Sequence, residues 1–256
     1  MLDIHQIPCL SDNYGYLIED KASGKVASID TPDADAIIAA AKARDLRIDQ
    51  IWNTHWHPDH AGGNAKIKAE FGSVIYAPKE VSGHGFACDE IIFPDSEISL
   101  GESHAKIIDV SGHTLGHIAF VFAQEKCAFV GDALFVLGCG RLFEGDGNMA
   151  WAGLSRLMVF DDDMEIYCAH EYSAANARFC QSLNLSNQAL AARVQEIFDL
   201  TAKSIPTVPT KLGKEKLTNP FLLADKVNLL SELELIGASD AAAFSKIRKM
   251  KDEFRG

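Results

Sequence analysis

The sequence lacks the features that indicate export or membrane insertion. Its N-terminus has no basic segment followed by an apolar stretch, so we expect no secretion signal. No apolar run approaches the roughly 18 residues of a membrane span. The six cysteines include no Cys-x-x-Cys pair, and an even count does not by itself indicate disulfides in a chain of 256 residues. We therefore expect a cytoplasmic protein with reduced thiols.

Basic residues are scarce relative to acidic ones. The chain has 24 Lys and Arg against 36 Asp and Glu, which gives a net charge of -12. Such a field repels phosphate backbones, so we expect no nucleic-acid partner, although a local basic patch would still accept an anionic substrate. A hydrophobic content of 47% and a charged content of 23% are ordinary for a globular enzyme.

Hydrophobic periodicity predicts an α/β arrangement followed by a helical region. Short apolar runs predict strands over residues 25–30, 48–53, 74–77, 106–110, 118–123, 127–130 and 165–168, with helices over 33–44 and 64–71. Beyond residue 170 the pattern predicts helices over 173–183, 187–203 and 240–254, the last capped by Ser239 or Asp240. We place the boundary between two domains there, with a catalytic domain over 1–170 and a smaller helical domain over 171–256.

The clearest functional signal lies in residues 54–60, which read Thr-His-Trp-His-Pro-Asp-His. Three imidazoles and a carboxylate this close would lose hydration on burial, and a divalent cation compensates for that loss. Extended backbone places His55 and His57 on one side, and the proline after His57 disfavours helix there. Asp59 and His60 then fall in the turn into the next helix, so one loop has the geometry to serve two metal centres.

Three further candidate ligands follow predicted strands: His113, Asp132 and His170. Taken singly, a histidine after a strand is usually an ordinary polar residue, and an aspartate there is usually a turn or cap residue. Beside the His-rich loop they become candidates, and the seven side chains suffice for two metals with one bridging carboxylate. His117 is surplus to the ligand count, and we expect it to support or pack against the ligands. Surface or structural roles are expected for the remaining histidines, which are His5, His84 and His104.

The motifs T-H-x-H-x-D-H, S-G-H-T-x-G-H, G-D and A-H-E-Y, in this order, resemble those of the metallo-β-lactamase superfamily. Residues 138–145 (Gly-Cys-Gly-Arg-Leu-Phe-Glu-Gly), together with Asn-Pro-Phe at 219–221, resemble one branch closely, glyoxalase II or the hydroxyacylglutathione hydrolases. The likeness extends from Asp-Asn-Tyr at 12–14 to the basic C-terminal segment. It implies an αββα sandwich followed by a smaller helical domain.

The resemblance also implies a ligand set and a reaction. One metal is expected on His55, His57 and His113, the second on Asp59, His60 and His170, and Asp132 is expected to bridge them. Zinc is the metal we expect first, and iron and manganese suit the same ligands. A metal-bridging hydroxide, positioned by Asp59 and Asp132, would attack a thioester carbonyl. The implied reaction converts S-D-lactoylglutathione to D-lactate and glutathione, a step of methylglyoxal detoxification.

Five residues are expected by resemblance to contact the glutathione moiety: Arg141, Phe143, Tyr172, Arg248 and Lys251. Arg248 and Lys251 lie three apart, on one face of a predicted helix, where periodicity alone would indicate a solvated basic face. Phe143 stands where many relatives carry tyrosine, so one hydroxyl contact to substrate is absent. Arg141 stands where others carry lysine and keeps the positive charge.

Alternatives remain open from the sequence. Cys139 lies between two glycines near these residues and would suit a thiolate nucleophile, although a small side chain in a tight loop accounts for it as well. Another hydrolase of the superfamily is possible, such as a broader acylthioesterase, a lactonase, a β-lactamase or a nuclease. A persulfide dioxygenase would use one iron and leave Asp59, His60 and His170 without a metal. A non-catalytic binding module should have lost ligands, whereas every position is kept here. We expect a monomer.

Overall fold

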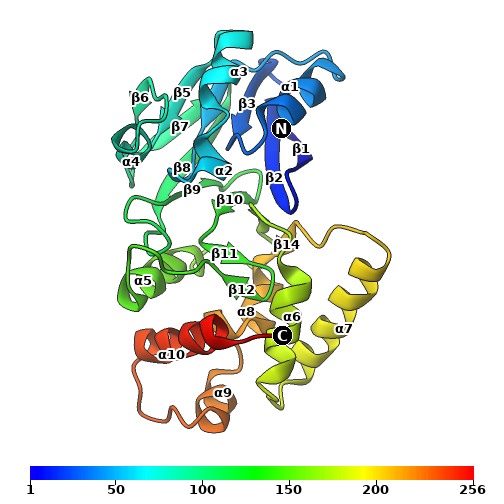
Figure 1. The fold of residues 1–256 in the computed structure, drawn as a ribbon, viewed down its shortest axis with the longest axis vertical. Coiled ribbons are helices and arrows are strands. Elements are labelled where there is room, and N and C mark those ends of the chain that lie inside the picture. Colours follow the sequence, from blue (N-terminus) through cyan, green and yellow to red (C-terminus); the bar gives the residue numbers. More distant parts are fainter.

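Two six-stranded β-sheets and a C-terminal group of helices make up the structure, a computed structural model that describes residues 1–256 (Figure 1). The sheets form the upper part in this view, and the helices beyond residue 170 form the lower part. This arrangement confirms the predicted fold class, an αββα sandwich followed by helices. The division into two domains at residue 170 stays a prediction.

The first sheet is mixed. Its first three strands pair antiparallel, and the remaining strands pair parallel to the third and to one another. Its strand order follows the sequence: β1 (Leu2–Cys9), β2 (Asn13–Asp20), β3 (Lys25–Ile29), β4 (Gln50–Trp52), β5 (Val74–Ala77) and β6 (Glu90–Ile91).

The second sheet is mainly antiparallel, with one parallel pair between β10 and β13. From edge to edge it contains β14 (Thr210–Lys211), β13 (Glu165–Cys168), β10 (Cys127–Gly131), β9 (Ile118–Phe122), β8 (Ser103–Asp109) and β7 (Glu97–Leu100). After β10, the chain forms a small two-stranded hairpin, β11 (Leu134–Phe135) and β12 (Gly138–Cys139). In space this hairpin lies against the C-terminal region, although the chain next enters α5.

Aromatic side chains fill the space between the two sheets. Trp52 of the first sheet stacks on Phe122 of the second, with ring centroids 5.9 Å apart. Tyr16 meets Phe129 edge to face at 5.2 Å. Rings of this size bury a large apolar area at each contact. These contacts pack the two sheets against each other and fix the positions of the strand ends from which the loops leave.

Helices cover the outer faces of the sandwich. α1 (Ala34–Lys42) and α3 (Asn64–Phe71) bury Ile37 and Ile67 against the first sheet. α5 (Gly147–Leu157) lies beside β8 of the second sheet and buries Leu154. The remaining helices of this part are short: α2 (Pro58–Ala61) and α4 (Lys79–Gly83).

The C-terminal region is helical, as the periodicity predicted. It contains α6 (Ser173–Ser182), α7 (Gln188–Ala202), α8 (Leu212–Thr218), the 3₁₀ turn η1 (Pro220–Leu222), α9 (Lys226–Glu232) and α10 (Asp240–Glu253). The Ser239 hydroxyl accepts a hydrogen bond from the backbone N–H of Ala242 and caps α10, which decides between Ser239 and Asp240. No helix anywhere in the chain has both the length and the apolar character needed to cross a membrane.

Candidate metal centre and adjoining pocket

The His-rich loop leaves the end of β4 and turns at once into the short helix α2. His57, the residue before Pro58, has φ -54° and ψ 147°, the extended conformation that a following proline favours. Asp59 and His60 lie inside α2 and group with His170, whereas His55 and His57 group with His113, although the His55 and His60 rings lie only 3.9 Å apart. The loop therefore divides its four polar groups between two neighbouring points.

The other three candidates arrive from the second sheet. His113 lies in the connection between β8 and β9, Asp132 directly follows β10, and His170 follows β13 by two residues. All three reach the His-rich loop, so the structure brings together every residue that the sequence proposed for metal binding.

The first cluster consists of three histidines. The distances from His57 Nδ1 to His55 Nε2 and to His113 Nε2 are 3.1 and 3.0 Å. The nitrogens of His113 and His55 that point away from the cluster are hydrogen-bonded. His113 Nδ1 donates to the Arg141 carbonyl at 2.7 Å, and His55 Nδ1 lies 3.0 Å from Thr54 Oγ1. Because the Thr54 hydroxyl donates to Asp30, it accepts from His55. These contacts leave the unprotonated Nε2 atoms facing inward.

The second cluster contains two histidines and a carboxylate. Asp59 Oδ2 lies 3.7 Å from His60 Nε2 and 3.5 Å from His170 Nε2. Here too the outward nitrogens are occupied, but their acceptors are carboxylates: His60 Nδ1 donates to Asp30 Oδ2 at 2.9 Å, and His170 Nδ1 to Asp12 Oδ1 at 2.9 Å. These bonds fix the tautomer and the orientation of both rings.

Asp132 lies between the clusters. Its Oδ1 atom is 3.4 Å from both His60 Nε2 and His170 Nε2, and its Oδ2 atom is 3.3 Å from His113 Nε2. Its backbone N–H donates to His117 Nε2 at 3.0 Å, and the His117 ring stacks on that of His55. One carboxylate thus faces both groups of histidines, and His117 has the supporting position expected for it.

The electrostatics of the two clusters differ. Burial and the neighbouring histidines lower the pKa of His55, and burial also lowers the pKa of His113. Burial acts the same way on His170, but the carboxylates around it, chiefly Asp132, outweigh burial and raise its pKa to about 9. In turn, His170 and His60 hold the pKa of Asp132 well below its usual range despite its burial.

These groups fit divalent cations. Inward-facing nitrogen lone pairs about 3 Å apart repel one another unless a positive ion lies among them. His60 Nε2 and Asp132 Oδ1 are buried without any hydrogen-bond partner, which is costly for polar atoms. Nitrogen and carboxylate oxygen are ligands of zinc, iron and manganese. The seven side chains therefore form a candidate site for divalent cations.

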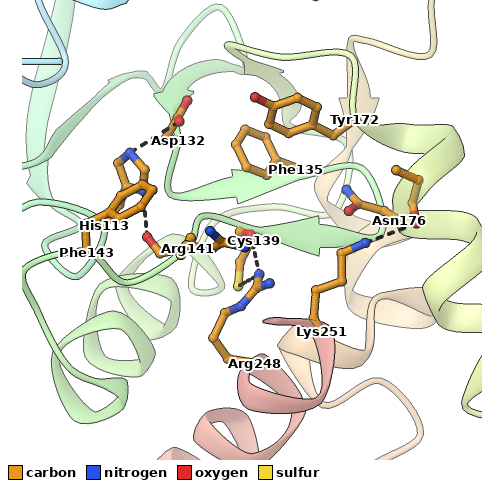
Figure 2. Close-up of a pocket in the computed structure, with 11 residues that line it drawn as sticks. His113, Asp132, Phe135, Cys139, Arg141, Phe143, Tyr172, Asn176, Arg248 and Lys251 are labelled. Carbon is orange, nitrogen blue, oxygen red and sulfur yellow. Dashed lines mark hydrogen bonds and ion pairs between the residues drawn. The ribbon is translucent and has the colours of Figure 1, made fainter. Parts of the chain in front are cut away.

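A cavity of about 330 Å³ adjoins the clusters and opens toward the C-terminal helices (Figure 2). His113 and Asp132 form its inner end, and Arg248 and Lys251 extend into it from α10. All five residues expected to contact glutathione line it. The complete lining is His113, Asp132, Phe135, Cys139, Arg141, Phe143, Tyr172, Ala175, Asn176, Arg248 and Lys251.

Arg248 is not part of a solvated face. It is only 7% exposed, its Nη1 donates to the Cys139 carbonyl at 2.9 Å, and its Nη2 donates to Asp252 Oδ1 at 3.0 Å. Lys251 Nζ donates to the Ala175 carbonyl at 3.1 Å, and burial together with the charge of Arg248 lowers its pKa to about 8. The pocket therefore gathers positive charge in an acidic protein, as an anionic ligand requires.

Arg141, Phe143 and Tyr172 are the exposed residues of the pocket lining. Arg141 Nε lies 3.3 Å from Asp252 Oδ1, so this carboxylate connects Arg141 to Arg248. Phe143 is 61% exposed and its ring packs edge to face against His57. The Tyr172 ring stacks on His170 at 4.6 Å, so the pocket and the second cluster share a wall.

Cys139 is placed poorly for nucleophilic attack. Its side chain is 5% exposed, and burial raises the pKa of its thiol to about 11, although Arg248 opposes this. A thiol that stays protonated at neutral pH is a weak nucleophile. The geometry favours the alternative role, a small side chain in a tight loop beneath Arg248.

Several residues that hold the site had no role predicted from the sequence. Asp30 bonds His60 and Thr54, Asp12 and Asn13 bond His170 and Asp59, and Asp252 bonds two arginines. Asn176 lines the pocket and donates to the Val136 carbonyl. A polar residue that ends a strand, as Asp30 does, was a usable signal, and Asp12 and Asn13 lie in the Asp-Asn-Tyr motif where the family likeness begins. Asp252 and Asn176 carried no signal without the three-dimensional arrangement.

Comparison with known sequences accounts for nearly the whole length of the chain. The family model for the metallo-beta-lactamase superfamily matches residues 16–170, and the model described as hydroxyacylglutathione hydrolase C-terminus matches residues 171–254. A hydroxyacylglutathione hydrolase of Erythrobacter litoralis is 47% identical over 254 residues, which is 99% of this chain and 100% of that protein. One from Hyphomonas neptunium is 46% identical and covers 99% of each.

Solved structures with a similar fold have much lower sequence identity. ETHE1 from Myxococcus xanthus aligns with a TM-score of 0.67 and 20% identity, over 96% of this chain and 90% of that one. The BLEG-1 B3 metallo-beta-lactamase aligns with a TM-score of 0.65 and 19% identity, over 87% and 99% of the two chains. At such identity these matches support the fold alone.

Proposed function

This chain belongs to the hydroxyacylglutathione hydrolases, the thiolester hydrolases also known as glyoxalase II, and from that premise we propose that it cleaves S-D-lactoylglutathione to D-lactate and glutathione. The observation that carries the proposal is the convergence of seven metal-binding groups at the inner end of a cationic pocket. A neutral thioester carbonyl and an anionic tripeptide tail need these two environments side by side.

We assign the metal-binding roles as the resemblance implies: His55, His57 and His113 on one ion, Asp59, His60 and His170 on the other, and Asp132 on both. Two divalent cations in such a site supply Lewis acidity, which makes bound water acidic enough to attack at neutral pH and stabilises negative charge on the carbonyl oxygen. Zinc is the ion we propose first, because histidine nitrogen predominates among the donors.

The protein groups have separate tasks in this scheme. Asp59 and Asp132 turn carboxylate oxygens toward the space between the clusters, where they orient the attacking water. Arg248, Lys251 and Arg141 attract the glutathione carboxylates and hold the acyl group against the clusters. The departing thiol has a pKa of about 8.5 in its free form, so it leaves without a strong general acid.

We further propose that the protein acts in the cytoplasm as a monomer, within methylglyoxal detoxification. All six cysteines are free in the structure, and five of them are buried. Unpaired thiols are typical of a reducing compartment, which is also where a glutathione thioester would be formed.

One assay tests the function directly. Purified protein should be supplied with S-D-lactoylglutathione and, separately, with simple acyl thioesters, while zinc, iron and manganese are quantified in the same sample. We expect hydrolysis of the glutathione thioester at least about tenfold more efficient in kcat/KM, with two metal equivalents per chain. Equal efficiency on all thioesters would indicate a broader acylthioesterase. Oxygen uptake with a glutathione persulfide, and a single iron, would indicate a dioxygenase instead.

A further inference from the structure

The turn between β1 and β2 is fastened to the loop that carries His170. The backbone N–H of Tyr14 donates to the Ala169 carbonyl at 2.7 Å, and the N–H of Glu171 donates to the Asp12 carbonyl at 2.9 Å. Between these two bonds, Asn13 and His170 form an isolated antiparallel bridge. The turn therefore cannot shift without moving the backbone on both sides of His170.

Asp12 of this turn and Asn13, where the turn enters β2, reach into the second cluster with their side chains. Asp12 Oδ1 accepts from His170 Nδ1 at 2.9 Å, and Asn13 Nδ2 donates to Asp59 Oδ2 at 3.0 Å and to the Asp59 carbonyl at 3.4 Å. Neither residue has a hydrogen bond with His55, His57 or His113. The turn thus contacts the second cluster only.

We propose that Asp12 and Asn13 are positioning residues that determine how tightly the second cation is bound. The proposal rests on the two-metal site assigned under the proposed function. Asp12 keeps the proton on His170 Nδ1, which leaves Nε2 free as a ligand and fixes the plane of the ring. Asn13 holds a carboxylate that is otherwise partly exposed, so that Asp59 does not rotate toward solvent.

This selectivity distinguishes the turn from Asp30, the other carboxylate beneath the ligands. Asp30 is buried and bonds His60 in the second cluster, and through Thr54 it also supports His55 in the first. Its removal would disturb both clusters and the fold. Asp12 is more exposed, with 37% of its side chain accessible, so its replacement leaves a smaller defect in packing.

The test measures bound metal rather than activity. Asp12→Ala, Asn13→Ala and the wild type are reconstituted with zinc, and affinity is obtained by competition with a chromophoric chelator. We expect each variant to keep the first ion and to bind the second about 10-fold to 100-fold more weakly. Asp12→Asn, which retains an acceptor oxygen but no charge, should bind the second ion with intermediate affinity.

Ser11→Ala is the matched control. Ser11 lies in the same turn, and its hydroxyl donates to Asp12 Oδ2 at 2.9 Å, the oxygen that does not contact His170. Its zinc binding should equal that of the wild type. Thermal melting of each metal-free variant shows whether the fold is preserved.

Two results overturn the proposal. Wild-type affinity for both ions in Asp12→Ala and Asn13→Ala means that the turn does not position the ligands. Equal weakening of both ions, together with a lowered melting temperature, means that the turn supports the fold and not the second cluster. A wild type that binds two ions but leaves thioesters intact contradicts the proposed function and leaves this inference standing, whereas a wild type that binds only one ion contradicts both.

Discussion

The metal clusters and the cationic pocket touch each other but are built in different ways. The cluster residues leave strand ends of one rigid sandwich, and His55, His60, His113, His170 and Asp132 are all buried. The pocket is assembled from loops of the sandwich, the β11–β12 hairpin and two helices of the C-terminal region, and Phe143, Tyr172 and Arg141 in its lining are exposed. The difference indicates that chemistry and recognition are separable: substitutions in the clusters should change kcat, and substitutions in the pocket should change KM.

The largest effect is expected for Asp132→Ala. This side chain faces both clusters, so under the proposed function its loss would remove a ligand from each ion and an oxygen that orients the attacking water. We expect both metal equivalents to fall together and kcat to drop by about a thousandfold or more. Metal analysis and steady-state kinetics on the same preparation measure this.

Asp163→Ala serves as the control for Asp132→Ala, because Asp163 is an exposed aspartate paired only with Lys126 on the surface. It should keep full activity and metal content. Retention of two metal equivalents per chain in Asp132→Ala would contradict the assignment of Asp132 as the ligand shared by both clusters.

Arg248→Ala is expected to have the next largest effect, and on the other parameter. The variant removes a buried guanidinium that faces the pocket, and a hydrogen bond to a charged group is worth about 1.5–3 kcal/mol, so KM for the glutathione thioester should rise about 10-fold to 100-fold. Metal content should be unchanged, with kcat altered less than KM. Lys249→Ala, which changes an exposed neighbour on the same helix, is the control. An unchanged KM would place the substrate elsewhere.

A smaller effect should appear on raising the pH. Burial lowers the pKa of Lys251 to about 8, so its ammonium is charged at pH 7 and loses its proton as the pH rises through 8. Below that value the charge attracts a glutathione carboxylate, and above it the attraction is lost. KM should therefore rise several-fold between pH 7 and pH 9.5. In Lys251→Arg this rise should be weaker, because arginine keeps its charge over the whole range. Identical pH profiles would show that Lys251 is not the titrating group.

The smallest effect is expected for Cys139→Ala, a substitution in the pocket lining at a residue that we expect neither to bind substrate nor to attack it. The thiol is buried and protonated, and Arg248 bonds mainly to the carbonyl of this residue, which the variant retains. We expect kcat and KM close to those of the wild type and a loss of stability of about 1 kcal/mol. Loss of nearly all turnover with both metals still bound would revive the thiolate mechanism.

The predicted metal residues were recognisable because their chemistry is concentrated in short motifs. Three histidines and an aspartate in one short loop are costly to bury without a metal, and the predicted strands showed where His113, Asp132 and His170 leave the sheet. The strands over β5 and β13 and the helices over α6, α7 and α10 agreed with the structure to within a residue or two at each end. In these segments the spacing of the apolar residues and the turn residues that flank them predict the same helix or strand.

No pattern in the sequence predicted the β1–β2 hairpin or α5. Strand β2 is buried on both faces, so it shows no alternation of apolar and polar residues that would distinguish it. α5 begins with Gly147 and contains a second glycine at 153, which disfavour a helix when judged by propensity alone. The contacts of Asp12 and Asn13 were missed with the hairpin, since no local pattern says that a turn will meet residues 46 and 158 positions away.

The carbonyl that orients His113 belongs to the main chain of Arg141, while the side chain of the same residue lines the pocket. Every amino acid has a backbone carbonyl, so residue 141 can be substituted without removing the hydrogen bond that orients the His113 ring. Residue 141 is therefore a place where the charge and size of the pocket lining can be varied while the acceptor that holds the His113 ring is kept.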